Sequence, residues 1–127
     1  MGQKRKTAIY DLEINQGADW SFEFIMSTQA GDEAPKVPID LTDYDFILAI
    51  KKTLKSPAAL ATLSTFNGKI TRDENGRVKC TLPGEITADL IAGPARYDIK
   101  AIRTGVVIAR PLEGKITISP ETSKYVP

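Results

Sequence analysis

Five carboxylates close together along the chain are the strongest candidates for metal-binding chemistry in this sequence. Asp40, Asp43 and Asp45 lie within six residues, and Asp32 and Glu33 precede them. Hard cations such as calcium bind several oxygens of this kind around one point. The spacing does not match an EF-hand, Asp45 is expected on the solvent face of a strand, and turn-forming carboxylates explain the others better. We therefore expect no metal and no cofactor.

The other residues that could support catalysis are few. The chain has no His and one Cys, which excludes His-based acid–base chemistry, Ser/His or Cys/His nucleophile pairs and His-containing zinc sites. Some carboxylate pair arises by chance among 16 Asp and Glu residues, so a glycosidase-type pair is not indicated. Cys80 shares its parity with Val78 and Leu82, which predicts a buried thiol. We predict that the protein is not an enzyme.

The two chain ends contain the residues that we expect to contact partners. Lys4, Arg5 and Lys6 form the one dense basic run, which favours an arm that orders against a neighbouring subunit over a nucleic-acid site. The formal net charge of +1, from 17 Lys and Arg against 16 Asp and Glu, also argues against binding phosphates. Tyr125 and Val126 offer two apolar anchors for a groove on a partner. We assign residues 1–7 as an N-terminal arm and residues 121–127 as a C-terminal tail.

Alternation of apolar and polar residues dominates the chain between these ends and predicts strands with one buried face. Asn-Gly pairs at 67–68 and 75–76 predict two hairpin turns. One short helix is expected within residues 83–93, ended by Gly93. The polar loop 28–36 is a candidate contact surface, although an ordinary corner loop is the better interpretation. The apolar positions of common parity predict a core between two sheets, made of Trp20, Phe22, Phe24, Phe46, Leu48, Ile50, Val78, Leu82, Tyr97, Ile99, Ile116 and Ile118.

Eight to ten short strands, separated by Gly and Pro and accompanied by one helix, are typical of an all-β domain. We predict an Ig-like antiparallel β-sandwich over residues 8–120, because nearly every strand alternates and each sheet would keep one face in water. No apolar run reaches the roughly 18 residues that span a bilayer, so no membrane is expected as a partner.

The order and spacing of several sequence blocks resemble a known family. The blocks are QGADWSF at 16–22, PIDLTDY at 38–44, NGKIT at 67–71, ITADL at 86–90 with RYDI at 96–99, and LEGKITISPE at 112–121. The family consists of small virion proteins of tailed bacteriophages and prophages, with a fold similar to the N-terminal domain of phage baseplate upper proteins. Two loop positions depart from its pattern: Asp43 stands where Gly is usual, and Pro94-Ala95 separates Gly93 from the Arg-Tyr strand.

The resemblance implies a non-enzymatic virion structural protein that docks or connects larger parts of the tail or baseplate region. It implies a location in the virion after synthesis in the host cytoplasm, with other phage virion proteins and further copies of the chain as partners, and no nucleic acid. A capsid decoration (cement) protein is the alternative within the same class. A carbohydrate-binding β-sandwich used in host recognition is the alternative from a different class.

Overall fold

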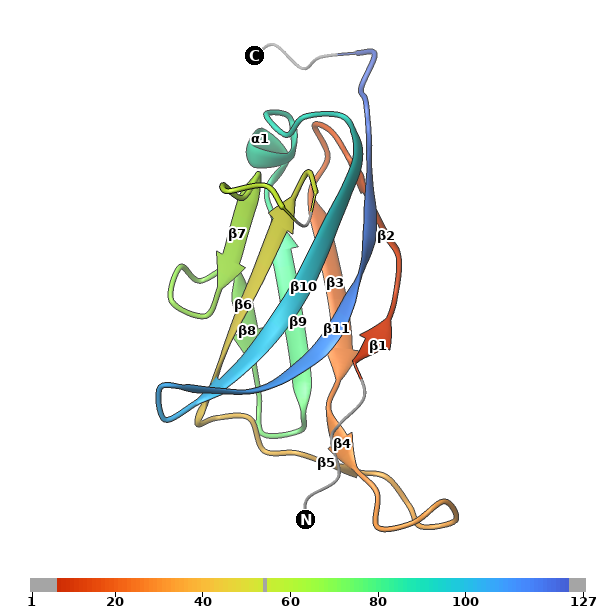
Figure 1. The fold of residues 1–127 in the computed structure, drawn as a ribbon, viewed down its shortest axis with the longest axis vertical. Coiled ribbons are helices and arrows are strands. Elements are labelled where there is room, and N and C mark those ends of the chain that lie inside the picture. Colours follow the sequence, from red (N-terminus) through yellow and green to blue (C-terminus); the bar gives the residue numbers. More distant parts are fainter. Residues whose placement is uncertain (1–6, 54, 124–127) are drawn as a thin grey trace.

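The computed structural model describes residues 7–53 and 55–123, which form two facing β-sheets (Figure 1). The larger sheet has the order β1-β11-β10-β6-β7, and β2 also pairs with β11. Its strands are β1 (Ala8–Ile9), β2 (Leu12–Asn15), β6 (Tyr44–Lys51), β7 (Ala61–Ser64), β10 (Gly93–Arg103) and β11 (Val106–Ser119). The second sheet has the order β3-β9-β8, with strands β3 (Trp20–Ile25), β8 (Ile70–Arg72) and β9 (Arg77–Leu82).

This arrangement confirms the predicted all-β, Ig-like sandwich. The order β11-β10-β6-β7 facing β3-β9-β8 matches strands G-F-C-C′ and B-E-D of an immunoglobulin variable-type domain. A small extra ladder joins β4 (Ser27–Thr28) to β5 (Val37–Pro38). The strands of the described residues run from Ala8 to Ser119, within the domain bounds that the sequence predicted.

Residues 8–14 alternate apolar and polar side chains, a pattern that predicts one strand of the antiparallel sandwich, but the structure differs there. This segment forms two short strands, β1 and β2, that both pair in parallel with β11. Alternation reports which residues face the core but not the direction of the neighbouring strand. Between β1 and β2 the chain passes over Gly114, where a Cβ at position 114 would overlap the Tyr10 carbonyl. Next to this contact, Asp11 Oδ1 accepts a 3.0 Å hydrogen bond from the Lys115 amide.

The core lies between the two sheets, and nine of the twelve predicted core residues are buried. The exceptions are Trp20, Phe22 and Phe24, which are half-buried. They lie on β3, an outer strand of the smaller sheet, so their rings line the open side of the sandwich, where the Tyr10 ring packs 5.4 Å from that of Phe22. Cys80 is buried as predicted, and burial raises the pKa of its thiol to about 12.

The two Asn-Gly pairs have different roles. Asn75-Gly76 joins the paired strands β8 and β9 as predicted, and the φ of Gly76 is 79°. Asn67-Gly68 instead leads from β7 in the larger sheet to β8 in the smaller sheet, so the hairpin prediction is wrong there. The Asn67 Oδ1 accepts bonds of 3.0 Å from the amides of Ser64 and Lys69, which stabilise this corner.

The predicted helix is shorter than expected. Helix α1 (Gly84–Thr87) has four residues, and bonds from the amides of Asp89 and Leu90 to carbonyls three residues back tighten the chain after it. The Thr87 hydroxyl is buried and donates 2.8 Å to the Ala18 carbonyl, which anchors the helix to the turn before β3. Gly93 has a φ of 118°, but it begins β10 rather than ending the helix. Among the described residues, no helix is long and apolar enough to cross a membrane.

Candidate functional site

The residues predicted to contact partners lie outside the described part of the chain. These are Lys4, Arg5, Lys6, Tyr125 and Val126. The structure therefore directs attention to other surfaces, one of which is bordered by the loop 28–36 that the sequence named as a candidate contact surface.

Two of the acidic residues near position 40, Asp40 and Asp45, have local partners. Asp40 Oδ1 accepts bonds from the Thr42 amide at 3.0 Å and from the Thr42 hydroxyl at 2.9 Å, and these bonds lower the pKa of Asp40. The Asp45 carboxylate accepts 2.8 Å from the Thr65 hydroxyl and lies 3.9 Å from Arg72. Over residues 7–53 and 55–123, no three His, Cys, Asp or Glu side chains gather in a way that could hold a metal ion.

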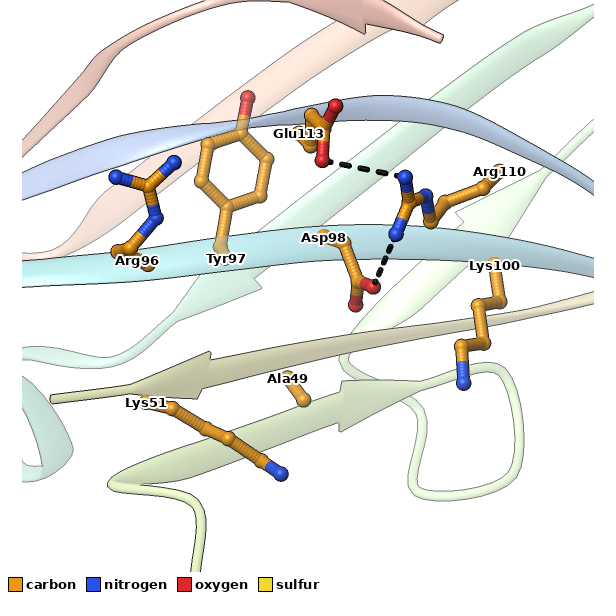
Figure 2. A pocket seen from close by; sticks show the side chains of 8 residues that line it. All are labelled: Ala49, Lys51, Arg96, Tyr97, Asp98, Lys100, Arg110 and Glu113. Carbon is orange, nitrogen blue, oxygen red and sulfur yellow. Dashed lines mark ion pairs between the residues drawn. The ribbon is translucent and has the colours of Figure 1, made fainter. Parts of the chain in front are cut away.

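A charged hollow of about 180 Å³ lies on the larger sheet (Figure 2). Strands β6, β10 and β11 supply its lining, which is Ala49, Lys51, Arg96, Tyr97, Asp98, Lys100, Arg110 and Glu113. The Arg110 guanidinium bridges Asp98 at 3.8 Å and Glu113 at 3.4 Å. Both carboxylates are thus engaged by one cation, and the hollow has a surplus of positive charge. The hollow can therefore attract an acidic surface of another protein. Each ion pair formed there would be partly exposed, and such ion pairs contribute less than about 1 kcal/mol each.

A larger and more apolar groove of about 480 Å³ opens at the side of the sandwich. One wall is the segment from Phe24 to Ser27, at the end of β3, and the other is residues 109–112 of β11, with Ala8 of β1 beside them. Phe24, Met26 and Leu112 make its interior apolar. The groove exists because β3 is an outer strand, so no further strand of the smaller sheet covers β11 in the described chain.

Exposed apolar side chains gather on the elements that border this groove. Six of the nine large hydrophobic residues exposed in the described chain lie on these elements, although only Ile25 lines the groove itself. The six are Ile9 on β1, Ile25 on β3, Val37 on β5, and Val106, Val107 and Ile108 on β11. Figure 1 shows β4, β5 and the hairpin between β10 and β11 in the half of the sandwich away from α1, with the hairpin projecting to the opposite side from the loop between β4 and β5. We call the groove and these six residues the apolar end.

Besides the loop 28–36, which contributes Gln29 and Lys36 to the groove, the sequence carried a second signal for the apolar end. Val106-Val107-Ile108 is an unbroken aliphatic run in a region where apolar and polar residues otherwise alternate. A strand whose two faces are both apolar cannot bury both against one core unless it is central. The groove itself had no such signal, because its walls come from segments about 85 residues apart in the chain.

Comparisons with known proteins do not assign a family to this fold and surface. The chain matches no model of a known protein family, and no curated protein matches it.

Proposed function

We propose that the protein is a non-enzymatic structural protein of a tailed-bacteriophage virion, a docking or connecting component of the tail or baseplate region. The observation that carries the proposal is the apolar end. Large exposed apolar patches on small proteins mark interaction sites, because their contact with water is unfavourable. A chain that exposes six large aliphatic side chains on the strands that border one groove is suited to burying them against a neighbour.

The architecture supports the same role. The sandwich is closed around a core that includes Phe46, Leu48 and Ile99, each fully buried, and close packing gives such a core the rigidity that a connecting part needs. The near-neutral charge of +1 favours packing many copies side by side. The sequence blocks that resemble phage virion proteins fall on strands and corners of this sandwich, from the corner at residue 16 to the end of β11.

The proposal includes the location and the partners. The protein works in the virion, bound to other phage virion proteins and to further copies of itself, and it binds neither nucleic acid nor membrane. The surplus positive charge of the hollow in Figure 2 offers a second, weaker contact for an acidic neighbour.

Mass spectrometry of purified phage particles, separated into heads and tails, tests the proposal. We expect the protein in the tail fraction, in a fixed ratio to the major tail proteins. Recovery with heads would support the decoration-protein alternative, and absence from intact particles would contradict a virion role.

A glycan array provides the remaining test: a sugar ligand that requires the exposed rings of Tyr10 or Phe66 would favour the carbohydrate-binding alternative.

A further inference from the structure

The hairpin between β10 and β11 has an unusually constrained tip. Thr104 and Gly105 form a two-residue connection in which both φ angles are positive, 53° and 75°, as in the turns that match the twist of paired strands. A β-branched residue rarely adopts a positive φ. The connection fixes Arg103 directly opposite Val106. The first residues of β11 are therefore held at the end of the two-stranded ribbon that β10 and β11 form.

Two bulges in β11 separate this tip from the rest of the sheet. Ile99 pairs with Leu112, but Ala101 pairs with Ala109, so two residues of β11 lie opposite one residue of β10. The next pair, Ile102 with Val107, leaves Ile108 as a second extra residue. Bulges re-aim side chains and increase the local twist. Val106, Val107 and Ile108 are consequently 61%, 54% and 47% exposed, although the same strand buries Ile116 and Ile118.

We propose that the apolar end forms a homodimer, in which the hairpin tip of each copy docks into the groove of the other. The inference rests on the proposed structural role for its biological meaning, and it names the surface and the partner. The tip, residues 106–108, and the groove wall, residues 109–112, are consecutive along β11. A two-fold rotation about an axis near their junction would place each tip over the partner's groove. Both copies of the interface are then used within the dimer, so neither remains free to bind a third chain.

The docking uses side chains rather than an added strand. Among the described residues, the outer edge of β11 pairs with β1 only from Leu112 onward, so residues 106–111 have neighbours only in β10. Pro111 has no N–H to donate, and the bulges interrupt the regular spacing of donors and acceptors. Such features protect an edge from pairing with another chain. Val107 and Ile108 are the side chains that the groove interior of Phe24, Met26 and Leu112 can accept.

Charge identifies a second copy as the occupant. Gln29 and Lys36 line the groove at the two ends of the loop between β4 and β5, so a docked tip lies beside this loop. The loop exposes Asp32 and Glu33, which form no ion pair within the described chain. Arg103 at the tip lies 5.4 Å from the ring of Tyr44 and likewise has no carboxylate partner in the described residues. Docking would bring Arg103 of each copy toward Asp32 and Glu33 of the other. Of the two cations that line the groove, Lys36 and Arg110, the second already pairs with Asp98 and Glu113.

Sedimentation velocity of the full-length protein over a concentration series tests the docking. We expect a reversible dimer that Val107→Asp weakens by more than about tenfold, because a charge would enter an apolar groove. Ile91→Asp is the matched control: Ile91 is 57% exposed on the loop after α1, away from the groove, and its variant should dimerise normally. Since both positions are exposed, thermal melting should show that both variants fold.

A charge exchange tests the predicted register of the two copies. Arg103→Glu should weaken the dimer, and adding Asp32→Lys with Glu33→Lys should restore it. Only monomer up to about 1 mM, or a dimer that neither Val107→Asp nor Arg103→Glu affects, would overturn the inference. A protein found in particles but monomeric in solution would refute this interface and leave the virion role intact. A protein that forms this dimer in solution but is absent from particles would support the interface and refute the virion role.

Discussion

The Tyr97 hydroxyl donates a 2.5 Å hydrogen bond to the Tyr10 carbonyl, across 87 residues of sequence. Tyr97 is buried on β10, and Tyr10 lies where the chain passes from β1 to β2 over the edge of the larger sheet. The Tyr10 amide donates 2.9 Å to the Glu113 carbonyl of β11. These two bonds fix the first strands onto the sheet, and thereby fix Ala8 and Ile9 beside the groove of the apolar end.

Tyr97→Phe should reduce the free energy of unfolding by about 0.5–1.5 kcal/mol, because it removes the part-buried hydrogen bond to the Tyr10 carbonyl. Urea denaturation at neutral pH measures the change. Tyr10→Phe is the matched control, since it removes a hydroxyl but keeps the backbone carbonyl that accepts the bond. Equal effects of the two substitutions would show that the bond does not stabilise the fold.

The burial of the Tyr97 hydroxyl should produce a distinct dependence of the free energy of unfolding on alkaline pH. Burial, and secondarily the charge of Asp11, raise the pKa of Tyr97 from 10.0 to about 12. A folded-state pKa above the unfolded value means that the stabilisation is complete below pH 10 and is lost as the pH rises through 12. The stability difference between the wild type and Tyr97→Phe should therefore shrink between these pH values. A constant difference would contradict the assignment.

Gly114→Ala should destabilise the protein by about 1–3 kcal/mol, the range for a forced steric overlap in a packed site. A Cβ at position 114 would overlap the Tyr10 carbonyl, which is backbone and cannot rotate away. Gly31→Ala is the control, because a Cβ there would have no neighbour within 4 Å. Thermal melting of both variants makes the comparison, and an unchanged melting temperature for Gly114→Ala would show that β1 and β2 are not held against β11.

Phe46→Ala should cost about 3–5 kcal/mol of stability, the usual consequence of removing a fully buried phenyl ring. Phe46 is 0% exposed on the central strand β6, whereas Phe66 is 71% exposed on the corner before β8. Phe66→Ala should therefore change the midpoint of chemical denaturation little. A loss below about 1 kcal/mol at position 46 would mean that the core has been assigned to the wrong face of β6.

The two Asn-Gly pairs show what the sequence could and could not predict. Local chemistry specified that both Gly68 and Gly76 adopt a positive φ, 78° and 79° respectively. It could not specify whether the flanking strands pair with each other, because that depends on the long-range contacts of β7 with β6. Parity likewise predicted the buried face of β6, β9 and β10, where both neighbouring strands are present, but overestimated burial on β3 at the edge of its sheet.

The groove and the hairpin tip could not be predicted from the sequence, for a related physical reason. Alternation assumes that each strand keeps one register along its length. The bulges of β11 change the inward face between Leu112 and Val106, so the two ends of this one continuous strand, Val106–Ser119, face different surroundings. The aliphatic run at 106–108 and the polar loop 28–36 were the features of the sequence that pointed to this surface.

Photo-cross-linking from position 107 within assembled phage particles tests most directly whether the apolar end is the docking surface. A photoreactive amino acid at position 107 should cross-link the protein to a second copy of itself or to another virion protein, with a probe at position 91 giving far less product. Efficient cross-linking at 91 with none at 107, or no virion product from either position in particles that contain the protein, would contradict this account.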